Sequence, residues 1–158
     1  MLKLLRIDDR LVHGQVAFTW VPSLGVDCLL VANDKVARDD FQKMTLGLAK
    51  PAATKLIIKS VDDAVLFLND EKNKSLKILT LVNSVVDAFA LASGVQQVQS
   101  INFGGIRSRE GAKLISKAIA VTDEDVTLIR ELLRRGIELE IRQVPSDQKQ
   151  KVESFIQG

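Results

Sequence analysis

The chain has 158 residues, of which 46% are hydrophobic and 27% charged, and its 22 basic and 20 acidic side chains give a net charge of +2. A chain of this length buries around two thirds of its unfolded surface, so we expect one domain covering residues 1–158. Scattered basic residues and scarce aromatic ones argue against nucleic-acid binding, and no apolar run approaches the roughly 20 residues that span a bilayer.

The cellular compartment follows from cysteine usage and from the N-terminus. The single cysteine gives no disulfide framework, and the first apolar stretch is too short for a signal peptide before charges intervene. We therefore expect a cytoplasmic protein that reaches the membrane only through partners.

Short apolar runs of strand type alternate with segments of helical period. This alternation predicts an α/β fold with an open, mostly parallel central sheet of about six or seven strands and helices on both faces. Strands are expected at 2–7, 28–32, 55–59, 77–82, 98–102 and 137–142, with a further strand within 115–121.

Helices are expected at 14–24, 34–48, 62–68, 84–92 and 123–135. In the first of these, Val16 and Trp20 share one face, and we interpret Trp20 as a core anchor. In the last, Thr122 and Asp125 resemble a capping box, and Gly136 supplies the stop. The tail, residues 145–158, is expected to form a polar helix capped by Ser146 or Asp147.

The only histidine, His13, lies where the first predicted strand passes into the first predicted helix, in the run Arg6-Ile-Asp-Asp-Arg-Leu-Val-His-Gly-Gln-Val. Open parallel sheets bind ligands at this edge, outside the carboxyl ends of their strands. A neutral imidazole offers a nitrogen lone pair, so His13 is a candidate nucleophile. With one histidine and one cysteine, we expect no metal site.

The turn after the first strand suits a phosphoryl group, because it gathers an imidazole, the guanidiniums of Arg6 and Arg10, and the backbone amides at Gly14. Nucleotide-binding and esterase motifs are absent, so we expect no cofactor. Phosphoryl transfer asks mainly for positioning and charge neutralisation. In this interpretation His13 attacks phosphorus while Arg10 binds the equatorial oxygens.

Two carboxylates, Asp8 and Asp9, have open roles. Either one could hold Arg10, or accept the proton of the other imidazole nitrogen and fix the tautomer. Either could equally be an ordinary solvated cap of the first helix. We count Asp9 among the residues of the phosphate site.

Two further turns meet the first one if the sheet is parallel. Asn83 and Ser84 follow one strand, and Phe103, Gly104 and Gly105 follow another. Such turns present amides to an anion, although glycine pairs by themselves mostly mark turns. We expect Asn83, Ser84, Gly104 and Gly105 to contribute to phosphate binding. The apolar neighbours Leu11 and Val12 are either core or part of a flat, exposed rim around His13.

These residues resemble the IIB component of the mannose/fructose/sorbose class of the bacterial sugar phosphotransferase system (PTS). The run around His13, with Trp20 seven residues beyond it, resembles that family's signature. The likeness continues through Asp34, residues 102–105, residues 120–125 and residues 135–140, so it spans nearly the whole chain. The Leu-Val-His form of the motif and residues 144–149 look more like the N-acetylgalactosamine-type branch.

The resemblance implies a cytoplasmic phosphocarrier with a mostly parallel sheet. The histidine matching His13 would accept a phosphoryl group from component IIA, and Arg10 would handle that group. A hexose or amino sugar delivered by the membrane components IIC and IID would receive it, so the protein would associate with the inner membrane through these partners. Family members often self-associate, which makes a homo-oligomer an expectation too.

Two other functions stay open from the residues alone. The same turn would serve a module that binds a phosphosugar or a nucleotide reversibly, without covalent chemistry. Alternatively, His13 is purely structural and caps a helix in a protein that works by contacts.

Overall fold

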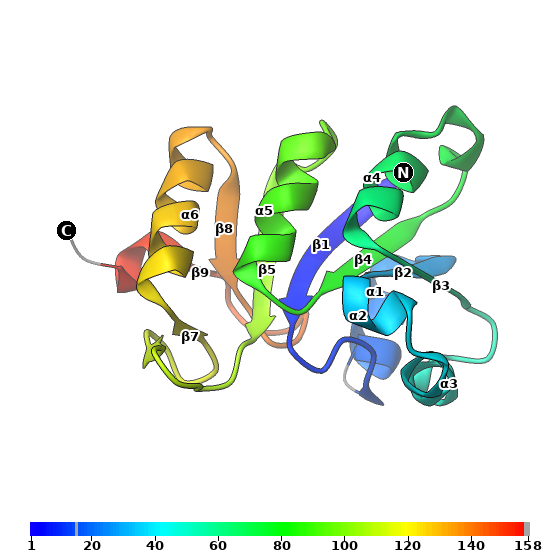
Figure 1. Cartoon of the computed structure of the whole chain (residues 1–158), viewed down its shortest axis with the longest axis horizontal. Coiled ribbons are helices and arrows are strands. Elements are labelled where there is room, and N and C mark those ends of the chain that lie inside the picture. Colours follow the sequence, from blue (N-terminus) through cyan, green and yellow to red (C-terminus); the bar gives the residue numbers. More distant parts are fainter. Residues whose placement is uncertain (15, 157–158) are drawn as a thin grey trace.

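The structure is a computed structural model that describes residues 1–14 and 16–156. Its central element is a seven-stranded sheet with the strand order β3-β2-β4-β1-β5-β8-β9 (Figure 1). All neighbouring strands in it are parallel except β9, which is antiparallel to β8. The predicted α/β fold with an open, mostly parallel sheet is therefore confirmed. The strands are β1 Leu2–Asp8, β2 Cys28–Ala32, β3 Lys55–Lys59, β4 Ile78–Val82, β5 Ser100–Gly105, β8 Glu138–Ile141 and β9 Gln150–Lys151.

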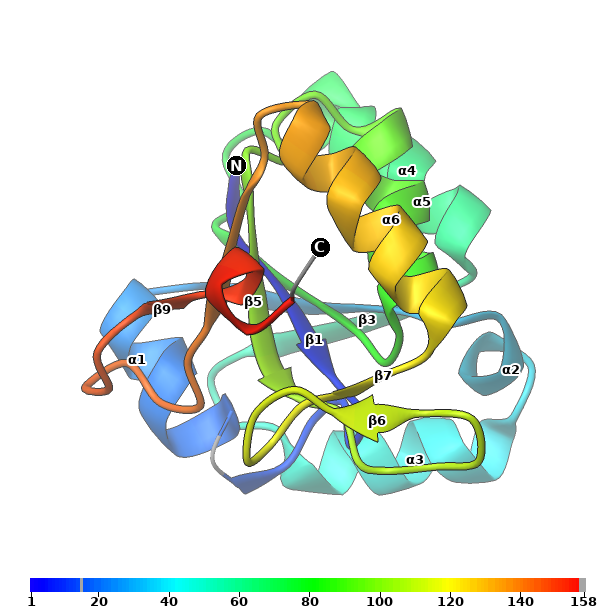
Figure 2. The ribbon, with the colours of Figure 1, turned by 90° about the vertical axis from the view of Figure 1, so that its left-hand side faces the viewer.

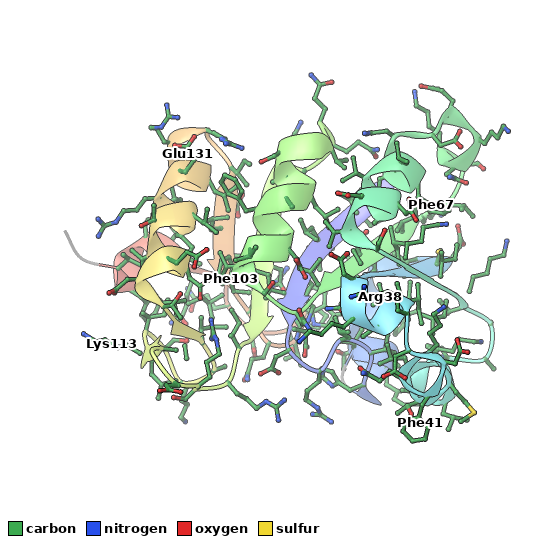
Figure 3. All side chains as sticks on the ribbon, in the orientation of Figure 1. Arg38, Phe41, Phe67, Phe103, Lys113 and Glu131 are labelled. Carbon is green, nitrogen blue, oxygen red and sulfur yellow. The ribbon has the colours of Figure 1, made fainter. Side chains whose placement is uncertain are left out.

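Helices cover both faces of the sheet. On one face α4, α5 and α6 pack against one large apolar cluster; on the other, the segment from Val16 to Leu24 packs with Val36 and part of α3 against a second cluster (Figure 2). The labelled Phe103 belongs to the first cluster, whereas Phe41 on α3 points away from the body (Figure 3). The helices are η1 Val16–Trp20, α1 Val21–Leu24, α2 Asp34–Ala37, α3 Asp40–Ala49, α4 Val61–Asn69, η2 Glu71–Asn73, α5 Val85–Gly94, α6 Asp123–Arg134 and η3 Val152–Phe155. None of the helices within the described residues is long and apolar enough to cross a bilayer.

Local capping explains where several helices begin. Thr122 and Asp125 form the predicted capping box of α6, and Ser84 accepts the N–H of Asp87 at the start of α5. The expected single helix 34–48 is wrong, because it divides into α2 and α3. Asp39 has an extended backbone there, and its side chain accepts the N–H of Gln42, so a new helix begins at Asp40.

The first predicted helix, 14–24, is a π-helical turn followed by α1, and Gln15 lies outside the described residues. Val16 and Trp20 are both buried in the second cluster, as their spacing predicts. Trp20 also donates its Nε1 hydrogen to the carbonyl of Gln143 at 2.9 Å. It thus ties this segment to the chain that leaves β8.

Two strand predictions can be compared with the structure near the carboxyl edge of the sheet. Strand β5 runs from Ser100 to Gly105, not over 98–102, because it pairs with β1 and β8 along that length. The expected strand within 115–121 is present as β7, Ala120–Val121, which pairs with β6, Lys113–Leu114, in a separate small sheet. We call residues 106–121 the arm; Lys113 projects from it into solvent (Figure 3).

The predicted C-terminal helix is also wrong. Residues 150 and 151 form β9 against Glu140 and Ile141, and a short 3₁₀ turn follows in which Val152 is fully buried. The edge of β8 offers unpaired backbone groups, and pairing with them satisfies this segment better than an isolated polar helix would. Residues 157 and 158 lie outside the described part of the chain.

Candidate phosphoryl site

A cavity of about 330 Å³ opens at the carboxyl edge of the sheet, between the turn after β1, the end of β5 and the arm. It brings together six of the residues that the sequence predicted for the site: Arg6, Asp9, Arg10, His13, Gly104 and Gly105. Asp8, Lys117 and Gln143 also line it. The edge position follows from the parallel sheet, in which the carboxyl ends of β1 and β5 are neighbours.

Strand alternation places a row of polar side chains beneath this cavity. Arg6 and Asp8 are two residues apart on β1 and therefore share a face. Arg6 pairs in register with Asn102 on β5, which pairs with Glu140 on β8. Arg6 Nη1 donates to Asn102 Oδ1 at 2.7 Å, and Asn102 Nδ2 donates to Glu140 Oε1 at 3.2 Å. This buried row links three strands.

The carboxylate of Asp8 is the hub of the site. Its Oδ2 lies 2.7 Å from His13 Nε2 and accepts hydrogen bonds from Arg6 Nε at 3.3 Å and Nη2 at 3.1 Å. Its Oδ1 accepts the backbone N–H of Arg10 at 3.0 Å. Burial by itself would raise the pKa of Asp8, but the hydrogen bond with His13, the charge of Arg6 and the Arg10 N–H together lower the pKa below its ordinary value. Asp8 is therefore an anion that accepts hydrogens.

The anionic partner decides which nitrogen of His13 is free. Because Asp8 accepts a hydrogen, Nε2 of the neutral ring carries the proton, and the lone pair is on Nδ1. The ring is only 9% exposed and forms part of the cavity wall. Of the two alternatives left open for Leu11 and Val12, the structure confirms the core: both are buried in the second apolar cluster.

The backbone between Asp8 and His13 makes a tight turn. Leu11 N–H donates to the carbonyl of Asp8 at 2.9 Å, and Leu11 has a φ of 58°. A left-handed conformation costs a non-glycine residue about 1–2 kcal/mol, and such strain persists where the surroundings over-determine it. Here the burial of the Leu11 side chain and the hydrogen bonds made by Asp8 hold the turn in this conformation.

Arg6 has a different role from the expected one. The side chain is 1% exposed, and its guanidinium is committed to Asp8, to Asn102 and to the carbonyl of Arg142. Burial lowers the pKa of Arg6, although the charge of Asp8 opposes that effect. Arg6 therefore holds Asp8 in place. Because the nitrogens of its guanidinium already have these partners, Arg6 has little capacity to bind a phosphoryl group as well.

The Arg6 guanidinium also explains why residue 104 is a glycine. A Cβ at position 104 would overlap the Cζ, Nη1 and Nη2 atoms of Arg6, so only glycine fits there. At position 105 nothing lies within 4 Å of such a Cβ; the carbonyl of Gly105 accepts the N–H of Asp9 at 2.9 Å. The glycine pair thus serves packing and strand pairing.

Arg10 is the cation that the cavity leaves available. It is exposed, it lines the cavity with His13, and its guanidinium has no hydrogen-bond or ion-pair partner among residues 1–14 and 16–156. Lys117, on the arm, is also exposed and lines the same cavity. The cavity is therefore lined by an imidazole and by two exposed, positively charged side chains, Arg10 and Lys117.

Asp9 ties the arm to the turn after β1. Its Oδ2 accepts hydrogen bonds from Arg107, from the backbone N–H at 2.7 Å and from Nε at 2.9 Å. Two residues further along the arm, Arg109 Nη2 pairs at 2.7 Å with Oδ2 of Asp125, which belongs to the capping box of α6. Asp9 thus holds the arm against the turn after β1, and its predicted contact with phosphate stays a prediction.

Three predicted phosphate ligands do not line the cavity: Gly14, Asn83 and Ser84. Ser84 is used to cap α5, which packs on one face of the sheet. The turn to His13 leaves β1 on the opposite face, where Leu11 and Val12 join the second cluster. Neighbouring strands thus send their connections to different sides.

Several polar residues at or near the site were missed, among them Asn102, Lys117, Glu140 and Arg142. Asn102, Glu140 and Arg142 are polar positions within apolar runs, and Glu140 and Arg142 are two residues apart in the last predicted strand. That period marks one face of a strand and could have identified the two together. Lys117 carries no such signal. No group of three or more metal-ligating side chains occurs within the described chain.

Comparison with known proteins places these residues in context. Residues 2–158 match the family model described as the sorbose subfamily IIB component of the PTS system. The chain is 36% identical, over 84% of its length and 85% of the relative's, to a probable phosphotransferase enzyme IIB component of Streptococcus pyogenes. It is 33% identical over 99% of its length to the mannose-specific EIIAB component of Escherichia coli, of which it covers 48%. The chain thus spans about half the length of that relative.

Solved structures agree with this similarity. The IIB domain of the sorbose permease from Klebsiella pneumoniae superposes with a TM-score of 0.93 and 28% identity, covering 98% of this chain and 95% of that one. The N-acetylgalactosamine-specific IIB component 1 from Escherichia coli superposes with a TM-score of 0.86 and 30% identity, covering 96% and 99%.

Proposed function

The chain belongs to the sorbose subfamily of PTS IIB components and is a phosphotransferase, and from this premise we propose that His13 is the residue that carries the phosphoryl group. The observation that supports the proposal is the 2.7 Å contact between Asp8 and His13 Nε2 in the wall of a cavity with cations on its rim. The contact fixes one ring nitrogen and leaves the other free.

In the first step, the lone pair of His13 Nδ1 attacks the phosphorus of a phosphohistidine on component IIA. A new P–N bond forms, the donor's P–N bond breaks, and its electron pair returns to the donor ring. Nε2 keeps its proton throughout, and the positive charge that the ring gains is stabilised by the Asp8 carboxylate.

In the second step, a hydroxyl oxygen of a hexose or amino sugar attacks the phosphorus. The P–Nδ1 bond breaks, its electron pair returns to His13, and the hydroxyl proton passes to water. The transferring group spreads its charge over three equatorial oxygens in both steps. Arg10 lines the cavity, and its planar guanidinium can donate hydrogen bonds to two of these oxygens at once and so neutralise part of their charge.

The partners follow from the family. We place component IIA on the donor side and the membrane components IIC and IID, with the sugar, on the acceptor side. The protein then works on the cytoplasmic side of the inner membrane as a single IIB domain. Because the His13 ring lies in a cavity wall, a partner must present its reacting group into the cavity.

The experiment is phosphoryl labelling by phosphorylated IIA. Because the chain has one histidine, any acid-labile, base-stable adduct reports on His13 directly. We expect one phosphoryl group per chain, none in His13→Gln, and a ³¹P spectrum of a phosphoryl group on Nδ1. Labelling of the His13→Gln variant would overturn the proposal.

A reversible binding module would behave differently. It would bind phosphate esters without a covalent adduct, and binding would survive His13→Gln but weaken in Arg10→Ala. Measuring adduct and reversible binding on the same two variants separates these functions.

A further inference from the structure

The wall of the phosphoryl cavity contains more cations than it can pair. Its positively charged side chains are those of Arg6, Arg10, Arg107 and Lys117. Two of them form ion pairs with carboxylates of the same wall, Arg6 with Asp8 at 3.1 Å and Arg107 with Asp9 at 2.9 Å. The other two, the Arg10 guanidinium and the Lys117 ammonium, have no hydrogen-bond or ion-pair partner within residues 1–14 and 16–156.

This excess of two positive charges matches a phosphoryl group. Asp8 and Asp9 are the acidic side chains of the wall, so the charges of Arg10 and Lys117 stay uncompensated. A phosphate monoester carries about −1.5 to −2 charges at pH 7. Arg10 by itself balances only about half of that charge, and Lys117 is the group of the wall that can balance the rest.

Backbone hydrogen bonds hold Lys117 next to the end of β5. The arm begins at Ile106, directly after β5, and its second half returns to the same residue (Figure 2). The N–H of Ile106 donates to the carbonyl of Ala118 at 2.9 Å, and the N–H of Ala120 donates to the carbonyl of Ile106 at 2.8 Å. Because Lys117 directly precedes Ala118, its position is fixed by the strand and not only by a surface loop.

The end of β5 also holds the turn that carries Arg10. The N–H of Asp9, the residue before Arg10, donates to the carbonyl of Gly105 at 2.9 Å. Chain segments joined by such bonds lie about 5 Å apart. Arg10 and Lys117 therefore start from two segments that are each bonded to the same short stretch of β5 and its continuation.

Lys113 shows that this position is not general to the arm. It is exposed as well, but it projects into solvent and does not line the cavity (Figure 3). An ordinary surface lysine of this kind is simply solvated. The two lysines belong to one segment, carry the same charge and differ in whether they line the cavity, which makes Lys113 a matched control.

We propose that Lys117 is a second phosphoryl-binding residue of the carrier. Its ammonium donates to an oxygen of the phosphoryl group on His13, while Arg10 binds the other oxygens. The inference rests on the proposed function, because it needs a phosphoryl group on His13. An ammonium with three donors on a flexible four-carbon stem can keep this contact as the phosphorus moves between donor, His13 and acceptor.

The first test measures the equilibrium of phosphoryl transfer between phosphorylated IIA and the full chain. The proteins are the unchanged chain, Lys117→Gln, Lys117→Arg and Lys113→Gln, and ³¹P spectra give the fraction of phosphoryl group on each partner. We expect Lys117→Gln to lower the transfer equilibrium constant about 3- to 10-fold. Lys117→Arg keeps the charge, and Lys113→Gln loses the same charge away from the cavity, so both should stay within about twofold of the unchanged chain.

The second test follows the ionisation of the phosphoryl group itself. A nearby cation favours the dianion, so the pKa of the phosphoryl group on His13 should be higher in Lys117→Gln than in the unchanged chain. The ³¹P shift of the phosphorylated proteins, recorded against pH, measures it. Lys113→Gln should leave this pKa unchanged, and a lysine that only supported the fold of the arm would not alter it either.

The two variants at positions 117 and 113 also separate this inference from the proposed function. If both glutamine variants are labelled on His13 and shift the equilibrium and the titration equally, Lys117 does not bind the phosphoryl group and the carrier function stands. If phosphorylated IIA does not label the unchanged chain, the proposed function fails, and this inference fails with it.

Discussion

One oxygen of Asp8 contacts both His13 Nε2, at 2.7 Å, and Arg6 Nη2, at 3.1 Å. The imidazole is thereby held by a carboxylate that is itself held by a buried cation. Arg6 is fixed in turn by Asn102 on the neighbouring strand. The orientation of the His13 ring therefore depends on the pairing of β1 with β5, and not only on the turn that carries it.

Replacing the carboxylate that holds the imidazole should slow phosphoryl uptake without removing it. An asparagine at position 8 can donate a hydrogen bond to Nε2 of His13. The proton of the neutral ring then lies on Nδ1, and Nδ1 no longer has a lone pair with which to attack phosphorus. We expect Asp8→Asn to lower the rate of labelling by between about 10²- and 10⁴-fold, as for other residues that fix a catalytic tautomer. Rapid-quench labelling measures the rate, with Asp62→Asn on the exposed face of α4 as the control. An unchanged rate in Asp8→Asn would remove Asp8 from the mechanism.

Acid stability should depend on the same carboxylate. The pKa of Asp8 is lowered in the folded chain from an ordinary value of 3.8, so the unfolded chain binds the proton more readily. The stabilisation from Asp8 is therefore complete above the ordinary value and is lost as the pH falls through the lowered one. Urea unfolding from pH 7 down to pH 2 should show a steeper loss of stability for the unchanged chain than for Asp8→Asn. Parallel curves for the two proteins would contradict this assignment.

Arg10 should contribute to transfer through its geometry as well as its charge. A charge-assisted, bidentate contact is worth about 1.5–3 kcal/mol, so Arg10→Ala should lower the transfer rate by roughly 10- to 150-fold. Arg10→Lys keeps the charge but loses the fork, and its rate should fall between the two. Arg38, whose Nε donates to the carbonyl of Asp34 away from the cavity, is the matched control. Equal rates for Arg10→Ala and Arg38→Ala would show that Arg10 takes no part.

The two glycines Gly104 and Gly47 should respond in opposite ways to alanine. A methyl group at position 104 overlaps the buried Arg6 guanidinium, so we expect Gly104→Ala to cost about 2–4 kcal/mol of unfolding free energy. Gly47 is within α3 with nothing within 4 Å of an added Cβ, and alanine there should stabilise by about 0.5–1 kcal/mol. Chemical denaturation measures both, and a neutral Gly104→Ala would mean that the guanidinium can move aside freely.

Much of the fold could be read from the pattern of residues. The apolar runs that become β1, β2, β3, β4 and β8 are local signals, and so are the polar caps before α4, α5 and α6. Boundaries were less predictable. Gly104 and Gly105 look like a turn, yet strand pairing with β1 extends β5 through both. The C-terminal segment looks like a polar helix, yet the open edge of β8 pairs with it as β9.

The candidate site also contains features that the sequence predicts and features that it does not. The turn after β1 could be located from His13, Arg10 and the strand before them, because neighbours in sequence remain neighbours in a short turn. The distinct roles of Asp8 and Asp9 could not be predicted, because Asp8 is the last residue of β1 whereas Asp9 already belongs to the turn, and their partners come from different parts of the chain. Asp8 turns to His13 and Arg6, whereas Asp9 binds Arg107 on the arm.

The sequence by itself determined the alternation of strands and helices, the single imidazole and its place at the end of the first strand, because these depend on periodicity and composition within a few residues. Tertiary structure decided that Arg6 is a buried support, that Asn102 and Glu140 extend the polar row, and that Lys117 and His13 line the same cavity. The hydrogen bonds in this row join positions 96 residues apart for Arg6 and Asn102, and 38 apart for Asn102 and Glu140. Strand register and the packing of both sheet faces determine them, and neither is encoded in any local stretch of the chain.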